Sequence, residues 1–186
     1  AIWTLDPVAT TNSLTVSDSI TTSQIVLRGS ANSRGNSNPK GFFRYSKDST
    51  YATGTSTTTQ ENISSSSDVT LTPVTVSSGI DSASIYYYSA GVQAGNKTKY
   101  GNSKTILTLP DAPTAPSLTL NGTSGTFAFT AVSKGSNVTI TYHVSCSATG
   151  QTTITASGTA TSYSMSGFVP GAEYTCSVYG TSSATS

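Results

Sequence analysis

Short segments in which apolar and polar residues alternate recur along almost the whole chain, and no stretch combines helical periodicity with helix caps. Ile25 and Leu27 share one face of such a segment, and Phe43 and Tyr45 share one face of another. Alternation with a period of two is typical of a strand with one buried face. Many short strands separated by turn residues indicate two packed sheets. The sequence therefore predicts an all-β sandwich protein.

The composition excludes several classes of function. More than a third of the 186 residues are Ser or Thr, and only 9% are charged, against about a quarter in an average globular protein. The net charge is +1, so nothing in the composition suggests a nucleic-acid partner. No stretch is long and apolar enough for a membrane span. We expect neither a nucleic-acid partner nor membrane insertion.

A proline-rich segment divides the chain. Three prolines in seven residues, Pro110, Pro113 and Pro116, favour a stiff, extended connector and lack the donor that a central strand needs. The strand-like segments before and after it predict two domains in tandem. The expected parts are a strand-like N-terminal segment (1–5), a first domain (6–109), a linker (110–116) and a second domain (117–186).

The second domain carries a motif that resembles a known family. Residues 167–179 read Gly-Phe-Val-Pro-Gly-Ala-Glu-Tyr-Thr-Cys-Ser-Val-Tyr, similar to the Gly-Leu-x-Pro-Gly-x-x-Tyr-x-Cys-x-Val pattern of fibronectin type III domains. Residues 79–86 keep the spacing from the apolar residue to the tyrosine but lose the Pro-Gly pair. The resemblance implies two tandem immunoglobulin-like sandwiches. It also implies that Tyr86 and Tyr174 form tyrosine corners, in which the hydroxyl bonds to nearby backbone.

The first domain is also similar to fibronectin-like repeats of bacterial surface proteins and phage virion proteins. Residues 27–32, 43–45 and 100–101 match the pieces Leu-x-Gly-x-Ala-Asn, Phe-x-Tyr and Tyr-Gly of those repeats. This resemblance specifies the fold much better than the function, because the fold hosts many roles.

Both cysteines fall in the second domain. An even count in such a chain favours a disulfide between Cys146 and Cys176 over two free buried thiols, and a disulfide indicates an oxidising compartment. The family pattern implies that the two cysteines lie on neighbouring antiparallel strands, so the bond would be cross-strand. We expect Cα atoms about 4.4–6.8 Å apart.

No constellation in the sequence indicates catalysis, a metal or a cofactor. The single histidine, His143, is expected to be a solvent-facing strand residue, and the eight acidic residues are scattered. Tyr87 could stack on a sugar, although simple alternation, with Tyr86 and Tyr88 inward, explains the tyrosine run better. Four Asn-x-Ser/Thr sequons are candidate glycosylation sites, at Asn62, Asn96, Asn121 and Asn137.

The second domain is expected to lack its last strand within the chain. Against the intact strand 100–109, residues 182–186 followed by residues 1–5 of a neighbouring chain give a strand of equal length. This places Ile2 opposite Ile106. An open edge invites another chain to pair with it. The predicted subunit contact consists of Ala1, Ile2, Trp3, Thr4 and Leu5.

The sequence therefore predicts a non-enzymatic subunit of an extracellular or cell-surface filament that associates with itself head to tail. One alternative is a virion or tail-fibre decoration module. Another is a spacer or carbohydrate-binding repeat of a larger secreted enzyme or adhesin, in which case the two ragged ends result from excision. Any contact with a surface glycan or a host is left open by the sequence.

Overall fold

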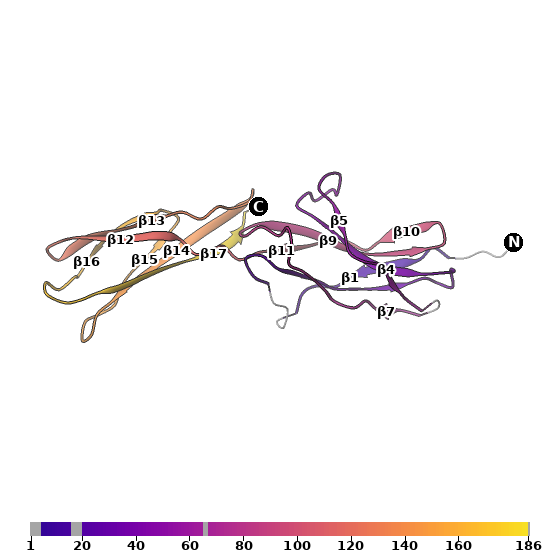
Figure 1. Ribbon diagram of the computed structural model, residues 1–186, viewed down its shortest axis with the longest axis horizontal. Helices are drawn as coiled ribbons and strands as arrows, with labels where there is room; N and C mark the ends of the chain where they lie inside the picture. Colours follow the sequence, from indigo (N-terminus) through magenta and orange to yellow (C-terminus); the bar gives the residue numbers. More distant parts are fainter. Residues whose placement is uncertain (1–4, 16–19, 65–66, 186) are drawn as a thin grey trace. The chain divides into compact units, whose positions relative to one another are not determined.

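The computed structural model describes residues 5–15, 20–64 and 67–185, and in these ranges it contains strands and no α-helix (Figure 1). The chain forms two compact units, Ala1–Thr108 and Leu109–Ser186. The all-β fold predicted from the alternation is confirmed.

The first domain has two layers of strands. In one layer β3 pairs with both β1 and β7, and β2 pairs with β8. The strands of this layer are β1 (Val8–Thr11), β2 (Ile25–Leu27), β3 (Gly29–Asn32), β7 (Val69–Thr70) and β8 (Val74–Val76). The interruption between β7 and β8 contains Pro73, which the sequence placed at an edge or a bulge.

The second layer of the first domain is built around a long central strand, β9. β9 pairs with β4 on one side and with β10 and β11 on the other. The strands are β4 (Lys40–Ser46), β5 (Ser56–Thr57), β6 (Glu61–Asn62), β9 (Ile85–Ala94), β10 (Lys97–Tyr100) and β11 (Lys104–Leu107). Both edges of β9 are therefore paired.

Side chains from the two layers fill the core of the first domain. Ile25, Leu27, Phe43 and Tyr88 are almost completely buried. Gly29 allows the two layers to pack closely, because a Cβ at this position would lie 2.5 Å from the Cβ of Ala90.

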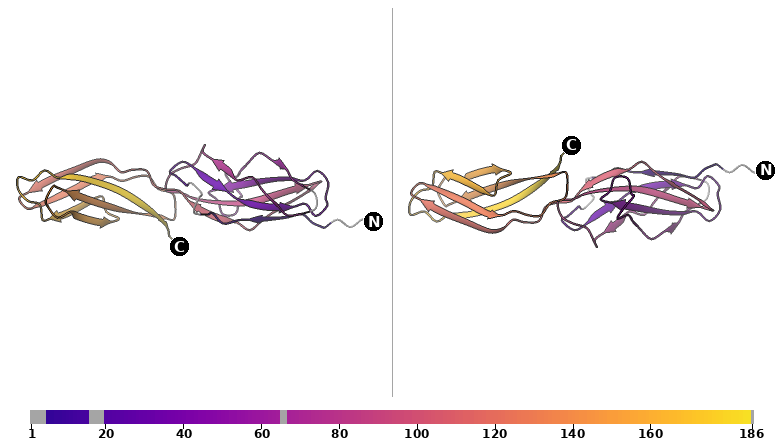
Figure 2. Two further views of the ribbon diagram at one scale, coloured as in Figure 1. Left: turned by 90° about the horizontal axis from the view of Figure 1, so that it is seen from below. Right: turned by 90° about the horizontal axis from the view of Figure 1, so that it is seen from above.

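The second domain has two three-stranded sheets, ordered β12-β13-β16 and β15-β14-β17. In Figure 2 these strands, coloured from pink through orange to yellow, lie in two layers. Their bounds are β12 (Thr114–Asn121), β13 (Ser124–Thr130), β14 (Val138–Ser147), β15 (Ile154–Gly158), β16 (Ser162–Ser166) and β17 (Thr175–Ala184). Phe127, Val138, Val144 and Phe168 are buried between the sheets.

Three expectations about boundaries are corrected. β12 begins at Thr114, so the last part of the predicted linker is strand; a register irregularity between Thr114 and Ser117 accommodates Pro116. The last strand of the first domain is not the single segment 100–109 but β10 and β11, between which the pairing register with β9 shifts by one residue. Ser182, Ser183 and Ala184 belong to β17, paired with Ile140, Thr139 and Val138, and so do not begin a further strand.

Candidate functional site

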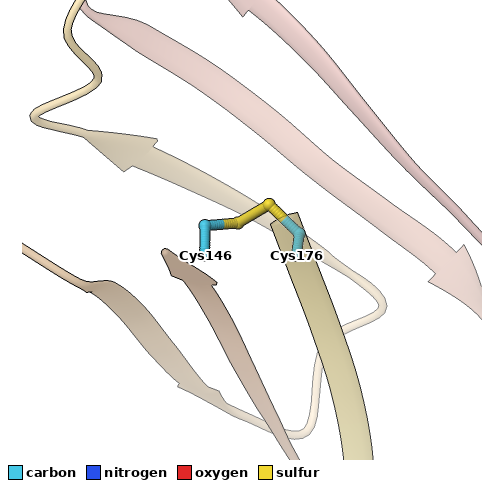
Figure 3. The surroundings of a disulfide bond; sticks show 2 residues. All are labelled: Cys146 and Cys176. Carbon is cyan, nitrogen blue, oxygen red and sulfur yellow. A yellow bond between two sulfur atoms is a disulfide. The ribbon is translucent and has the colours of Figure 1, made fainter. Parts of the chain in front are cut away.

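The predicted disulfide is present and crosses two neighbouring strands (Figure 3). Cys146 of β14 and Cys176 of β17 are directly opposite in the ladder, and their sulfurs are bonded. Their Cα atoms are 4.0 Å apart, closer than the predicted range. The bond therefore fixes the start of β17 to the end of β14.

Both predicted tyrosine corners form. The Tyr86 hydroxyl accepts a hydrogen bond from the backbone N–H of Asp81 at 2.9 Å, and the Tyr174 hydroxyl accepts one from Val169 at 3.2 Å. In each case the donor lies five residues upstream, as the equal spacing in the two domains implied. Tyr86 and Tyr88 are buried and Tyr87 is half-buried, which confirms the predicted alternation.

Of the predicted subunit contact, Ala1, Ile2, Trp3 and Thr4 lie outside the described residues. Leu5 is 64% exposed, and its carbonyl oxygen accepts a hydrogen bond from Nδ2 of Asn36 at 2.8 Å. Asp6 then forms ion pairs with Lys97 and Lys99. The chain is thus attached to its own first domain through the Leu5 carbonyl and the Asp6 carboxylate.

The feature that stands out in the second domain is one edge of β17. In the described part of the chain, β17 pairs with β14 and no strand pairs with its other edge. The equivalent strand of the first domain, β9, has the same length of ten residues and carries β10 and β11 on that side. The inward side chains of β9 are buried, whereas those of β17 are only half-buried.

The ladder shows which backbone groups of β17 face this edge. The 4.0 Å Cα separation at Cys146–Cys176 is that of a non-hydrogen-bonded pair, since hydrogen-bonded pairs lie about 5.5 Å apart. Two-residue alternation then directs the N–H and C=O groups of Cys176, Val178 and Gly180 away from β14. Thr185 is an odd number of residues away from these three, so its N–H should point toward β14. Its N–H does donate to the backbone oxygen of Asn137, just before β14, at 2.8 Å.

The open edge of β17 also lacks the features that usually prevent edge pairing. Natural edge strands are protected by charged residues, proline, bulges or short length. The outer strands β10 and β11 of the first domain carry lysines, and β12 contains Pro116 and a register irregularity. The ten residues of β17 include no charged residue and no proline.

A neighbouring segment lies against the inner face of β17 near Gly180. A Cβ on Gly180 would lie 3.5 Å from Cγ of Pro110, so the chain that leads into β12 passes close to the middle of β17. The half of β17 that begins at Thr175 is therefore the better place for an incoming strand.

The outer face of the same sheet carries an aromatic pair. The rings of His143 and Tyr179 stack with centroids 4.8 Å apart and planes 17° apart, and Tyr179 is 58% exposed. Nε2 of His143 lies 3.2 Å from the Thr181 hydroxyl. The predicted solvent-facing position of His143 is thus only partly right, because its ring is half-buried against Tyr179.

The acidic groups with clear roles in the described residues stabilise loops. Hydrogen bonds from the Thr50 hydroxyl and backbone lower the pKa of Asp48 to about 2. The ammonium groups of Lys97 and Lys99 lower the pKa of Asp6 to about 2. No cluster of His, Cys, Asp and Glu in the described part of the chain could hold a metal ion. The described residues form no helix long and apolar enough to cross a membrane.

The four candidate glycosylation sites are exposed. Asn96 and Asn121 lie at the β9–β10 and β12–β13 turns, and Asn137 precedes β14 with a positive φ of 58°. Asn62 differs, because its side-chain oxygen accepts a hydrogen bond from Lys40. Their glycosylation stays a prediction.

Comparison with known proteins identifies the architecture of the second domain. The family model of the fibronectin type III domain matches residues 111–186. The second domain is a fibronectin type III-like sandwich. The first domain repeats its strand scheme, with paired strands in place of the open edge of β17. Fibronectin type III domains are in general non-catalytic structural modules.

Similar solved structures include tandem fibronectin domains. A two-domain fibronectin type III segment of chicken tenascin is 19% identical, with a TM-score of 0.48, and the match covers 92% of this chain and 90% of that one. The FN1–FN3 domains of chicken CNTN1 are 10% identical, with a TM-score of 0.36, and the match covers 87% of this chain and 55% of that one. No curated protein matches the sequence.

Proposed function

We propose that the chain is a non-enzymatic structural subunit of an extracellular filament, assembled head to tail by strand addition at β17. The observation that carries the proposal is the edge of β17 that no described strand pairs with and that has no charged residue. The inward side chains of β17 are only half-buried, so an added strand could cover them. Pairing of an added strand satisfies exposed backbone groups, and its alternate side chains supply specificity. The disulfide is consistent with an oxidising, extracellular setting.

The donor we propose is the segment Ala1–Leu5 of a second copy. Because Ser182–Ala184 already lie in β17, the donor must pair with the edge by itself, and five residues match the part from Thr175 to Tyr179. An antiparallel pairing over this length puts Ile2 opposite Val178. Val178 occupies an inward position in β17. Ile106 in β11 of the first domain also points inward and is 2% exposed. This register keeps the inward direction expected for Ile2 from the sequence.

A lysine on the open edge tests the proposal. Val178→Lys puts a charge at an inward position whose backbone faces the incoming strand, and such a charge opposes edge pairing. Ser177→Lys is the matched control, because it adds the same charge to the next residue, on the outer face. Sedimentation velocity and electron microscopy of the full chain should show polymers for the unchanged protein and for Ser177→Lys. They should show monomers for Val178→Lys.

Deletion of residues 1–5 tests the donor separately. The truncated chain should stay monomeric, but it should still cap the growth of the full-length protein, because its β17 edge is intact. Circular dichroism before assembly checks that each variant is folded. Polymers of normal length from the truncated chain would exclude Ala1–Leu5 as the donor. Equal assembly of both lysine variants would exclude the edge of β17. A filament that forms only on virus particles would favour the decoration module instead.

A further inference from the structure

We propose that the outer face of the sheet β15-β14-β17 binds a neutral sugar ring. A shallow groove crosses this face, and it is lined by residues of all three strands. Tyr179 lies in it and is 58% exposed as a residue, although one side of its ring stacks on His143. The groove lies on the outer face and not at the edge where we place the donor strand, so this inference does not depend on filament assembly.

The orientation of the aromatic pair is fixed. Strand pairing places His143 opposite Tyr179 and also opposite Ser157, so the three residues form one row across the sheet. The imidazole is held between Tyr179 and the Thr181 hydroxyl. A flat, oriented aromatic surface that remains exposed to water is suited to the C–H face of a pyranose, which is itself apolar and flat.

The polar lining has the matching chemistry. Ser145, Thr155 and Ser157 contribute hydroxyl groups to the groove, and each hydroxyl can both donate and accept a hydrogen bond. No Asp, Glu, Lys or Arg lines the groove within the described residues. Binding sites combine apolar or aromatic surface with a few polar groups that fix orientation. A neutral, polyhydroxylated ring satisfies both requirements, whereas a charged ligand would find no counter-charge in the lining.

The probe that tests this site is cellotetraose, whose β-linked glucose rings present flat C–H faces and equatorial hydroxyls. Titration into the ¹⁵N-labelled chain without residues 1–5, which is expected to stay monomeric, should give saturable shifts of backbone signals in β14, β15 and β17. Tyr179→Ala should weaken binding by at least about tenfold. The matched control is Tyr87→Ala, which removes an outward tyrosine from the first domain and should leave binding unchanged.

A folded Tyr179→Ala protein is expected, because this side chain lies on the outer face; an unchanged melting temperature would confirm it. His143→Ala offers a second variant that removes the stacking partner but keeps the exposed tyrosine, and it should weaken binding less. Absence of saturable shifts up to the solubility limit would overturn the proposal. So would shifts that map to the first domain, or binding that survives in Tyr179→Ala.

Discussion

Removal of the Cys146–Cys176 bond should destabilise the second domain and leave the first unchanged. The two cysteines are 30 residues apart. In the chain-entropy relation, closure of a loop of this length lowers the entropy of the unfolded chain by an amount worth about 3.6 kcal/mol at 25 °C. A domain of roughly 80 residues has a total stability of about 4–12 kcal/mol. The disulfide thus accounts for about 30–90% of the stability of this domain.

Differential scanning calorimetry of the full chain, with and without a reducing agent, measures the effect. At about 4–8 °C per kcal/mol for a domain of this size, the transition of the second domain should fall by about 15–30 °C. The double variant Cys146→Ala with Cys176→Ala should show the same loss without any reductant.

The first domain is the internal control, because it contains no cysteine. Its transition should stay within error of the untreated protein. A second-domain shift equivalent to less than about 1 kcal/mol would refute the loop-closure reasoning. An equal shift of both transitions would show that the two domains unfold as one unit, so that the loss could not be assigned to the loop.

Three further predictions concern stability. Tyr86→Phe leaves the part-buried N–H of Asp81 without its acceptor and should cost about 1 kcal/mol, whereas Tyr174→Phe, at an exposed corner, should cost less; urea unfolding of each domain measures both. Gly29→Ala should destabilise the first domain by about 1–3 kcal/mol, because the added Cβ would lie 2.8 Å from the backbone oxygen of Thr10 and 2.5 Å from the Cβ of Ala90. Unchanged stability would show that β1 and β9 can move away from Gly29. The lysines of β10 lower the pKa of Asp6 to about 2 in the folded protein, whereas it is about 3.9 in the unfolded chain. The contribution of Asp6 to stability is therefore complete above pH about 4 and is lost as the pH falls through about 2. Asp6→Asn should abolish this part of the acid dependence, measured as melting temperatures over a pH series.

Alternation was enough to predict the all-β fold class, and the even cysteine count favoured the disulfide. The tyrosine corners and the cross-strand position of the cysteines followed from the resemblance to the fibronectin type III motif. Each of these depends on residues within one or two strands, such as the five-residue offset between Val169 and Tyr174. The alternation of Tyr86, Tyr87 and Tyr88 likewise follows from strand geometry alone.

Strand ends were less predictable, because tertiary pairing decides them. Pro116 suggested linker, yet the register irregularity lets the chain pair with β13 on both sides of it. The small polar residues Ser182–Ala184 looked like the start of a new strand, but ladder pairing with β14 extends β17 through them. The groove at Tyr179 was missed because its parts come from three strands, and only the register brings His143, Ser157 and Tyr179 into one row.

The open edge and the disulfide are connected energetically. β9 is held on both sides, and its inward side chains are buried; β17 is held on one side, and its inward side chains keep part of their surface in water. β17 therefore gains less from hydrophobic burial than β9 does, and the bond at Cys176 supplies stability that a partner strand would otherwise give. A strand that binds the edge adds to the stability of the folded domain by mass action, since it binds the folded state and not the unfolded one. Assembly should accordingly raise the melting temperature of the second domain relative to that of the unassembled chain, and it should do so most clearly when the disulfide is reduced.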